Sequence, residues 1–247
     1  MLKSLLTSGT VFTLAAGVYA YAAMWPASQI FGRTLIDGDD PEEFALTYDD
    51  GPNDPDTGRL LELLARHNVR ATFFLIGRFV RQRPEIARAI AQAGHLIGNH
   101  TMTHPLLALR SPGDVRRELA DCNAAIEDAL GQPVRYFRPP HGGRRPDVLR
   151  AARELGLTPV MWNAMGYDWK LSTPQKILIN VELGICRNRA RRRSSNILLH
   201  DGGQAGIGQD RMPTVKATGL LLEKYRSSIR FVTPDAWDDR AATTKLG

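Results

Sequence analysis

The sequence predicts an α/β barrel, and three observations support this fold class. Short apolar runs alternate with amphipathic stretches of helical periodicity, which is typical of βαβ units and a parallel sheet. The length of 247 residues suffices for a barrel built as one domain. Polar clusters also recur just beyond the expected strands, where α/β barrels place their active sites.

The expected elements follow one another in regular order. The strands are predicted at 44–48, 71–76, 96–99, 134–137, 159–162, 197–199 and 229–232. The helices are predicted at 59–67, 84–93, 114–130, 146–155, 175–190 and 213–225. Pro84 at the start and Gly94 at the end delimit one of these helices by residue type. This number of alternating units fits a barrel better than an open sheet.

The first 25 residues are expected to form an apolar helix that is either a membrane anchor or a signal peptide. Lys3 precedes an uncharged run over 5–25, which is long enough to span a bilayer. Residues 20–22, Ala-Tyr-Ala, also fit the small-residue cleavage pattern of a signal peptide. We favour a single-pass anchor with the rest of the chain outside the cytoplasm. Cleavage would instead give a secreted or periplasmic protein.

Three further segments are expected after the apolar start. Pro26 begins a stretch rich in Gly, Asp and Pro, so 26–42 is interpreted as a linker or stalk. The alternating elements place the folded domain at 43–234, and 235–247 is interpreted as a polar tail. Cys122 and Cys186 each lie on an apolar helical stripe, so both are expected to be buried free thiols.

The net charge of +6 suits anionic partners without selecting one. Five arginines between 187 and 193 form a basic run between a helix and the next strand, so we expect it on the barrel face opposite the site. A solvated surface is the preferred interpretation, with anionic lipid or wall polymer as the alternative partner. Nucleic acid is not expected because no aromatic pattern accompanies the charge. No protein partner is implied.

Candidate site residues follow several of the predicted strands: Asp49 and Asp50, then His100 and His104, Arg138, Asp168, and His200 with Asp201. The aspartate pair by itself could equally be a solvated turn. The His-x-x-x-His spacing, on one helical turn, would place both imidazoles on one side, able to bind one metal ion. Asp50 would complete a set of two histidines and one carboxylate, which suits Zn²⁺ and also Fe²⁺ or Co²⁺.

Five segments together resemble the polysaccharide deacetylase family, also called carbohydrate esterase family 4 or the NodB-homology domain. They are 47–52, 100–104, 138–142, 162 with 168–170, and 198–201, in the family's order. The resemblance covers roughly residues 44 to 233 and implies a distorted (β/α) barrel of about seven parallel strands. It also implies a divalent metal, which we expect to be Zn²⁺.

The resemblance implies a role for each matching residue. Asp50, His100 and His104 would bind the metal, and Asp49 would be the general base. Arg138 would hold Asp49 ionised, His200 would be the general acid, and Asp168 would orient His200 and raise its pKa. The remaining roles fall to the backbone N–H of His141, which would stabilise the oxyanion, and to Trp162 and Leu198, which would line an acetyl pocket.

One departure from the family pattern concerns the third segment, which usually carries Tyr where this chain has His141. The backbone role survives this change, but the imidazole alters the wall of the acetyl pocket and could add a nitrogen near the metal.

The predicted function is metal-dependent removal of N-acetyl groups from an amino-sugar polymer, with peptidoglycan, a chitin-like oligomer or an exported polysaccharide as substrate. Short loops suggest an open groove suited to an extended polymer. One alternative is a small amide or cyclic-imide hydrolase on the same fold. The other is a glycan-binding module without turnover, which the intact polar set argues against.

Overall fold

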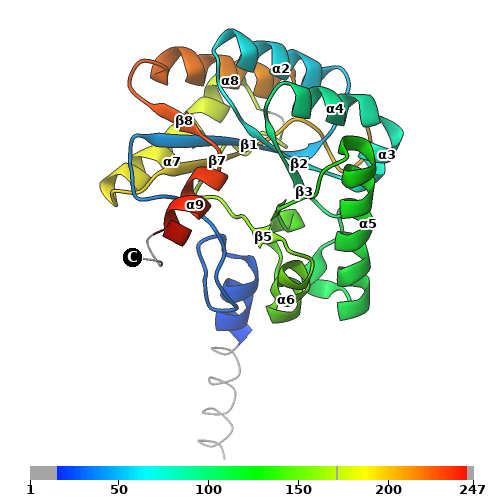
Figure 1. Ribbon diagram of the computed structural model, residues 1–247. Coiled ribbons are helices and arrows are strands. Elements are labelled where there is room, and N and C mark those ends of the chain that lie inside the picture. Colours follow the sequence, from blue (N-terminus) through cyan, green and yellow to red (C-terminus); the bar gives the residue numbers. More distant parts are fainter. Residues whose placement is uncertain (1–15, 171, 244–247) are drawn as a thin grey trace, which may run out of the picture.

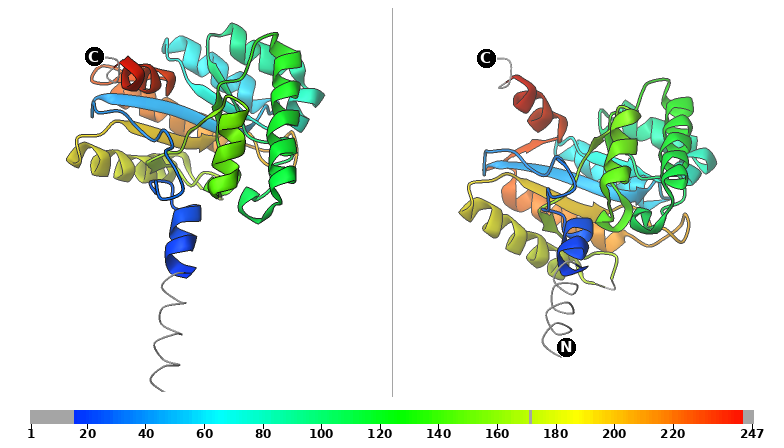
Figure 2. Two further views of the ribbon diagram at one scale, coloured as in Figure 1. Left: turned by 60° about the horizontal axis from the view of Figure 1, so that its bottom comes forward. Right: turned by 90° about the horizontal axis from the view of Figure 1, so that it is seen from below.

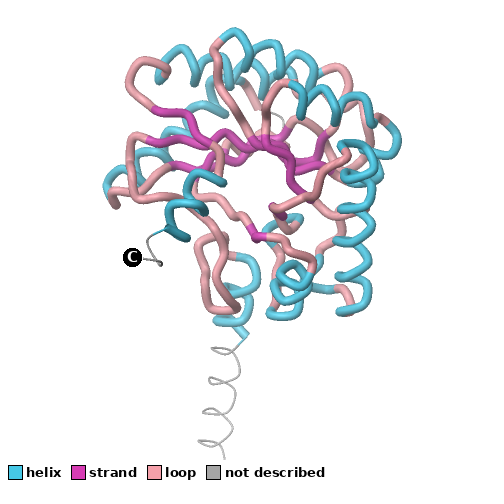
Figure 3. The backbone as a smooth tube through the Cα atoms, in the orientation of Figure 1, coloured by secondary structure: helices cyan, strands magenta, loops and turns pink. Residues whose placement is uncertain are grey.

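The computed structural model describes residues 16–170 and 172–243, and their strands form one parallel sheet (Figure 1). The strand order is β5-β4-β3-β2-β1-β7-β6, and β8 pairs with the start of β1. The strands are β1 (Glu43–Gly51), β2 (Thr72–Leu75), β3 (Leu96–Asn99), β4 (Tyr136–Phe137), β5 (Thr158–Pro159), β6 (Ala164–Met165), β7 (Ser195–His200) and β8 (Arg230–Val232). The predicted class is confirmed: the sheet curls into a half-barrel with helices outside it (Figure 3).

The barrel is distorted where β5 passes directly into β6. These strands occupy opposite ends of the strand order, yet only residues 160–163 separate them. The sequence predicted a single strand over 159–162, and this prediction is wrong. No helix returns the chain here, so the backbone crosses the opening of the barrel. Its carbonyl groups therefore need partners other than a sheet ladder.

The helices cover the outer face of the sheet and enclose the main core. They are α2 (Asp56–Arg66), α3 (Gly77–Gln82), α4 (Pro84–Gln92), α5 (Pro112–Leu130), α6 (Pro146–Glu154), α7 (Pro174–Ala190), α8 (Met212–Tyr225) and α9 (Asp235–Thr243). The longest, α5, begins at the side-chain cap of Ser111 and ends at Gly131, whose φ of 70° suits glycine. Six of these helices were predicted from periodicity, whereas α3 and α9 were not.

The segment predicted as a stalk packs against the barrel instead. Leu35 forms a parallel bridge with Val160, and its N–H and C=O bond to Pro159 and Met161 at 2.8 Å each. The side chain of Asp37 accepts a hydrogen bond from Asn163 at 2.8 Å. Long-range pairing of this kind leaves no compositional trace, so the Gly and Asp content suggested a linker.

The predicted apolar helix is described only in part. Residues 16–24 are helical, and the start of this helix projects from the body of the fold (Figure 2), whereas Ala22 and Ala23 are buried. Residues 1–15 lie outside the described part of the chain. Among the described helices, none has the length and apolar character needed to cross a bilayer. Anchoring therefore stays a prediction.

Two smaller expectations are wrong, and two are confirmed. The predicted polar tail forms α9, whose Trp237 is buried and donates to Glu43 at 2.8 Å. Cys122 is a buried free thiol as expected, but Cys186 is exposed because it lies on the outer side of α7. The basic run occupies the last turn of α7 and the loop that leads into the start of β7, away from the carboxyl ends of the strands, as predicted.

Candidate active site

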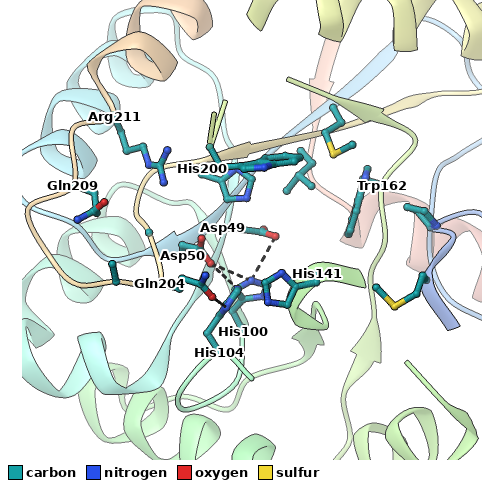
Figure 4. Close-up of a pocket in the computed structure, with 17 residues that line it drawn as sticks. Asp49, Asp50, His100, His104, His141, Trp162, His200, Gln204, Gln209 and Arg211 are labelled. Atoms are coloured by element: carbon teal, nitrogen blue, oxygen red, sulfur yellow. Dashed lines mark hydrogen bonds and ion pairs between the residues drawn. The ribbon is translucent and has the colours of Figure 1, made fainter. Parts of the chain in front are cut away.

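A cavity of about 540 Å³ opens at the carboxyl ends of the strands (Figure 4). Eight of the ten predicted site residues line it: Asp49, Asp50, His100, His104, His141, Trp162, Leu198 and His200. The other two, Arg138 and Asp168, are buried behind this lining and bond to Asp49 and His200. The structure therefore brings all the predicted residues together.

A bulge at the end of β1 turns both aspartates toward the cavity. Successive side chains of a strand normally point to opposite faces. The pairing of β1 with β2 shifts register between Asp49 and Gly51, and Asp50 has a φ of 72°. An extra residue in a left-handed conformation re-aims the side chains of a strand. The adjacent carboxylates can therefore serve one site, which a solvated turn would not require.

Asp50, His100 and His104 form a buried cluster of the kind that binds a metal ion. Oδ1 of Asp50 lies 3.4 Å from Nε2 of His100 and 3.0 Å from Nε2 of His104. Burial raises the pKa of Asp50, but its contacts with both histidines outweigh burial and hold the pKa well below its usual range. The carboxylate is therefore ionised.

The second nitrogen of each histidine indicates what the cluster holds. Nδ1 of His100 lies 2.8 Å from the backbone oxygen of Arg138, which can only accept a hydrogen bond. Nδ1 of His104 lies 2.8 Å from Oε1 of Gln204. A ring that carries its proton on Nδ1 has a free lone pair on Nε2, and both Nε2 atoms lie beside Oδ1 of Asp50, which has no hydrogen-bond donor among the described residues. A divalent cation fits such a set of three acceptors.

The two histidines do not lie on a helical turn, so that prediction is wrong. Residues 100–104 form a loop in which Thr101 and His104 have φ values of 67° and 65°. The Asn99 side chain accepts from Thr101 N at 2.7 Å, and the Thr101 hydroxyl accepts from His104 N at 3.0 Å. These local hydrogen bonds stabilise the left-handed backbone, and the centroids of the His100 and His104 rings lie 4.9 Å apart.

Asp49 is held by a buried arginine, as expected. Nη1 of Arg138 donates to Asp49 Oδ1 and to the Thr47 hydroxyl, each at 2.8 Å. The same guanidinium donates to the backbone oxygens of Val160 and Met161 at 3.4 and 3.2 Å. Arg138 thus supplies the partners that the strand crossing lacks and leaves Oδ2 of Asp49 facing the cavity side, 3.7 Å from His100.

His200 and Asp168 form the second acid–base pair. Oδ1 of Asp168 lies 2.8 Å from His200 Nδ1, and Oδ2 accepts from His200 N and from Thr214. Burial lowers the pKa of His200, but the charge of Asp168 and the more distant Asp50 and Asp49 raise it overall to about 9. His200 is therefore a cation near neutral pH, with Nε2 available to donate a proton.

Replacing Asp168 with asparagine should move the alkaline limb of the pH–rate profile to lower pH. The raised pKa keeps His200 protonated until the pH passes about 9, and Asp168 is its main cause. Without that charge the proton leaves at lower pH, so activity at pH 8 should fall more than activity at pH 6. The measurement is kcat against pH, with the exposed Asp121→Asn as control. An unmoved alkaline limb would exclude His200 as the titrating acid.

His141 and Trp162 form one wall of the cavity, beside the Asp50–His100–His104 cluster. The ring of His141 meets that of His104 edge-on, with centroids 4.8 Å apart, and its φ is 57°. Burial and the neighbouring histidines lower the pKa of His141, which favours a neutral ring. Trp162 and Leu198 pack together with Met161 in a small apolar cluster. Trp162 and Leu198 also line the cavity, so an apolar surface lies where the acetyl pocket is predicted, and that role stays a prediction.

Several cavity residues were not predicted. Gln204, Gln209 and Arg211 line the side opposite Trp162 (Figure 4), Met24 comes from the end of the predicted anchor segment, and Pro26 begins the predicted linker. Gln204 orients His104, and Arg78 donates a hydrogen bond to the backbone oxygen of Gln204. No motif marks these positions. Trp169, within the fourth segment, also lines the cavity and meets the His200 ring at 5.3 Å.

Asp201 was predicted at the rim without a role, and it is buried beside Thr57 and Gly51. Its Oδ2 accepts a hydrogen bond from Thr57, and a Cβ added at Gly51 would lie 2.4 Å from the same oxygen. Burial raises the pKa of Asp201 to about 7, and Asp50 and Asp49 contribute further. A carboxyl group in so tight a place requires glycine at position 51.

This parallel half-barrel, with two buried carboxylate pairs and the Asp50–His100–His104 cluster at the carboxyl ends of its strands, has the arrangement of an α/β barrel enzyme. A profile of the family described as polysaccharide deacetylase matches residues 37–160. The chain belongs to the polysaccharide deacetylase family, and it is a hydrolase of the deacetylase type.

Known relatives agree with this assignment. The chain is 38% identical over 184 residues to a chitooligosaccharide deacetylase of Rhizobium leguminosarum bv. trifolii, covering 74% of this chain and 80% of the relative. It is similar to a solved peptidoglycan N-acetylglucosamine deacetylase, with a TM-score of 0.74 and 31% identity over 82% of this chain and 91% of the other. A family 4 acetyl xylan esterase from Clostridium thermocellum, solved with a cobalt ion, gives 0.68 and 30% over 79% and 89%.

Proposed function

We propose that the protein hydrolyses the N-acetyl amide of N-acetylglucosamine units in a chitin-like or peptidoglycan polymer and releases acetate. The observation that carries this proposal is the placement of Asp49 and His200 on one cavity, each held by its own buried partner, beside the Asp50–His100–His104 cluster. The names of the relatives support the polymer class.

The donor set supports a divalent cation held by Asp50, His100 and His104, with Zn²⁺ expected and Co²⁺ or Fe²⁺ as alternatives. Such a cation polarises an amide carbonyl and lowers the pKa of a water molecule toward neutrality. A cobalt ion in the acetyl xylan esterase is consistent with this proposal.

The chain's own residues account for the proton transfers. Asp49 accepts a proton from the attacking water, and Arg138 keeps its carboxylate oriented through Oδ1. The water oxygen bonds to the acyl carbon, and the N–H of His141 donates to the resulting oxyanion. His200 then gives its proton to the leaving nitrogen as the C–N bond breaks. Trp162 and Leu198 enclose the methyl group, which disfavours longer acyl chains.

Two other functions fit the fold less well. A small amide or cyclic-imide hydrolase would not require the ligand cluster. A glycan-binding module would not require the buried ion pairs of Asp49 with Arg138 and of His200 with Asp168. In the proposed reaction these pairs position the groups that transfer protons.

Mass spectrometry of chitin oligomers and peptidoglycan fragments tests the proposal. The full chain is incubated with each substrate in the presence of Zn²⁺ or of a chelator. Loss of acetyl groups that requires the metal is the expected result. Intact substrates throughout, despite bound metal, would contradict the proposed substrate class. A small acetylated amide is incubated in parallel, and turnover of this amide alone would favour the first alternative.

We also propose that the N-terminal segment holds the protein at a membrane with the barrel outside the cytoplasm. The uncharged run over 5–25 and the exposed aromatic residues Tyr19, Tyr21 and Trp25 support this localisation, because such residues favour membrane interfaces. Fractionation of cells expressing the full chain, followed by a carbonate wash, distinguishes an anchored from a released protein.

A further inference from the structure

The wall of the cavity beside Trp162 and His141 contains residues from the N-terminal segment. Met24 and Pro26 line the cavity, although at least 16 residues separate them from β1 (Glu43–Gly51) and they lie before the family-matched region. A Cβ added at Gly142 would lie 3.0 Å from Trp162 and 3.6 Å from the carbonyl oxygen of Met24. The segment therefore packs directly on the loop that carries His141.

Arg144 joins the N-terminal segment to the loop that carries His141 by hydrogen bonds. Its side chain is 1% exposed and donates to the backbone oxygens of Trp25 and Ser28 at 2.7 Å, Gly142 at 3.0 Å and Pro26 at 3.3 Å. Its own N–H donates to Ala23 at 3.0 Å. Burial lowers the pKa of Arg144 to about 10, so the guanidinium is still charged near neutral pH. No acidic side chain pairs with Arg144 in the described ion pairs, so backbone carbonyls alone hold the charge.

The position of Met24 shows which part of a substrate it can meet. Trp162 and Leu198, at the acetyl pocket, are 9% and 3% exposed, whereas Met24 is 40% exposed. Met24 therefore lies at the rim, where a polymer leaves the reacting unit. Sugar rings present apolar C–H faces, and an apolar side chain at the rim can cover one of them.

We propose that residues 22–28 are a built part of the substrate site, in which Met24 and Pro26 contact the sugar next to the reacting one. Arg144 is the positioning residue that holds this wall against the His141 loop. The inference rests on the proposed function, because it assumes an amino-sugar oligomer in the cavity. It makes chain-length preference a property of the N-terminal segment.

Replacing Met24 with serine in the full chain should weaken the preference for oligomers over a single sugar. For a chitin tetramer, KM should rise about five- to tenfold, because roughly one apolar contact of a methionine is lost. The loss should appear in KM rather than in kcat, since Met24 touches no reacting atom. The measurement is kcat and KM on the tetramer and on N-acetylglucosamine.

Replacing Arg144 with methionine should have the same selective effect, because the wall loses its fastening. Arg145→Met is the matched control: Arg145 is the next residue, pairs with Asp147 and does not contact residues 22–28 in the described hydrogen bonds. If Arg144→Met does not fold, Met24→Ser alone decides the proposal. An equal loss on tetramer and single sugar, or no loss in either variant, would overturn it.

Binding separates this inference from the proposed function. Calorimetry measures binding of the chitin tetramer to the full chain carrying Asp49→Asn, with and without Met24→Ser. Weaker binding in the double variant supports the wall even if the wild type shows no turnover on amino sugars. Turnover by the wild type together with unchanged tetramer binding and KM in the Met24 variant would reject the wall and retain the function.

Discussion

Replacing Asp49 with asparagine should lower kcat by about 10²–10⁴-fold, the usual cost of losing a general base. Asparagine keeps the shape of the side chain and can still contact Arg138, so the fold and metal binding should persist. The measurement is kcat on a chitin oligomer together with metal content of the purified variant.

Asp54→Asn is the control for this substitution. Asp54 follows the same strand, but its side chain is 45% exposed and pairs with Arg83 outside the cavity. Its activity should match the wild type. Wild-type turnover by the Asp49 variant would refute its role as the base, and loss of metal from it would show that Asp49 serves the cluster instead.

Replacing His104 with alanine should remove both metal binding and turnover. A residue that hydrogen-bonds to a metal ligand typically contributes about 10–100-fold to metal affinity. Loss of the ligand itself should therefore lower the affinity by at least about 100-fold. Gln204→Ala removes the hydrogen-bond partner of His104 Nδ1, so its metal affinity should lie between those of the His104 variant and the wild type. Calorimetric titration with Zn²⁺ measures the affinities.

His67→Ala is the matched histidine control, because His67 lies at the end of α2 and does not line the cavity. After treatment with a chelator, the wild type should regain activity when Zn²⁺ is added, whereas the His104 variant should not. Full turnover of the wild type in a strong chelator would contradict the metal proposal.

The sequence predicted the fold class and the residues that meet at one cavity, because each depends on a local signal. Periodicity located most strands and helices, and short motifs located Asp49, His100 and His200. What it could not predict depends on contacts distant in sequence. The crossing between β5 and β6 looks like one strand locally, and its carbonyl groups find Arg138 and Asn196 only in the folded chain.

Two features of the site also could not be predicted from the sequence: the backbone of residues 100–104 and the rim of the cavity. The spacing of His100 and His104 is compatible with a helix, and only the bonds from Asn99 and Thr101 select the loop. Met24 reaches the cavity because Arg144 holds its segment, and no pattern within residues 22–28 indicates such a contact.

The bridge between Leu35 and Val160 has a consequence for handling the protein. A barrel that does not close leaves unpaired strand edges, which are sites of edge-to-edge association between molecules. Leu35 pairs with the chain just beyond β5 and so covers part of that edge. The family-matched region begins at residue 37, two residues later. A fragment cut at that boundary would expose the edge, and its aggregation would be a property of the cut and not of the natural chain.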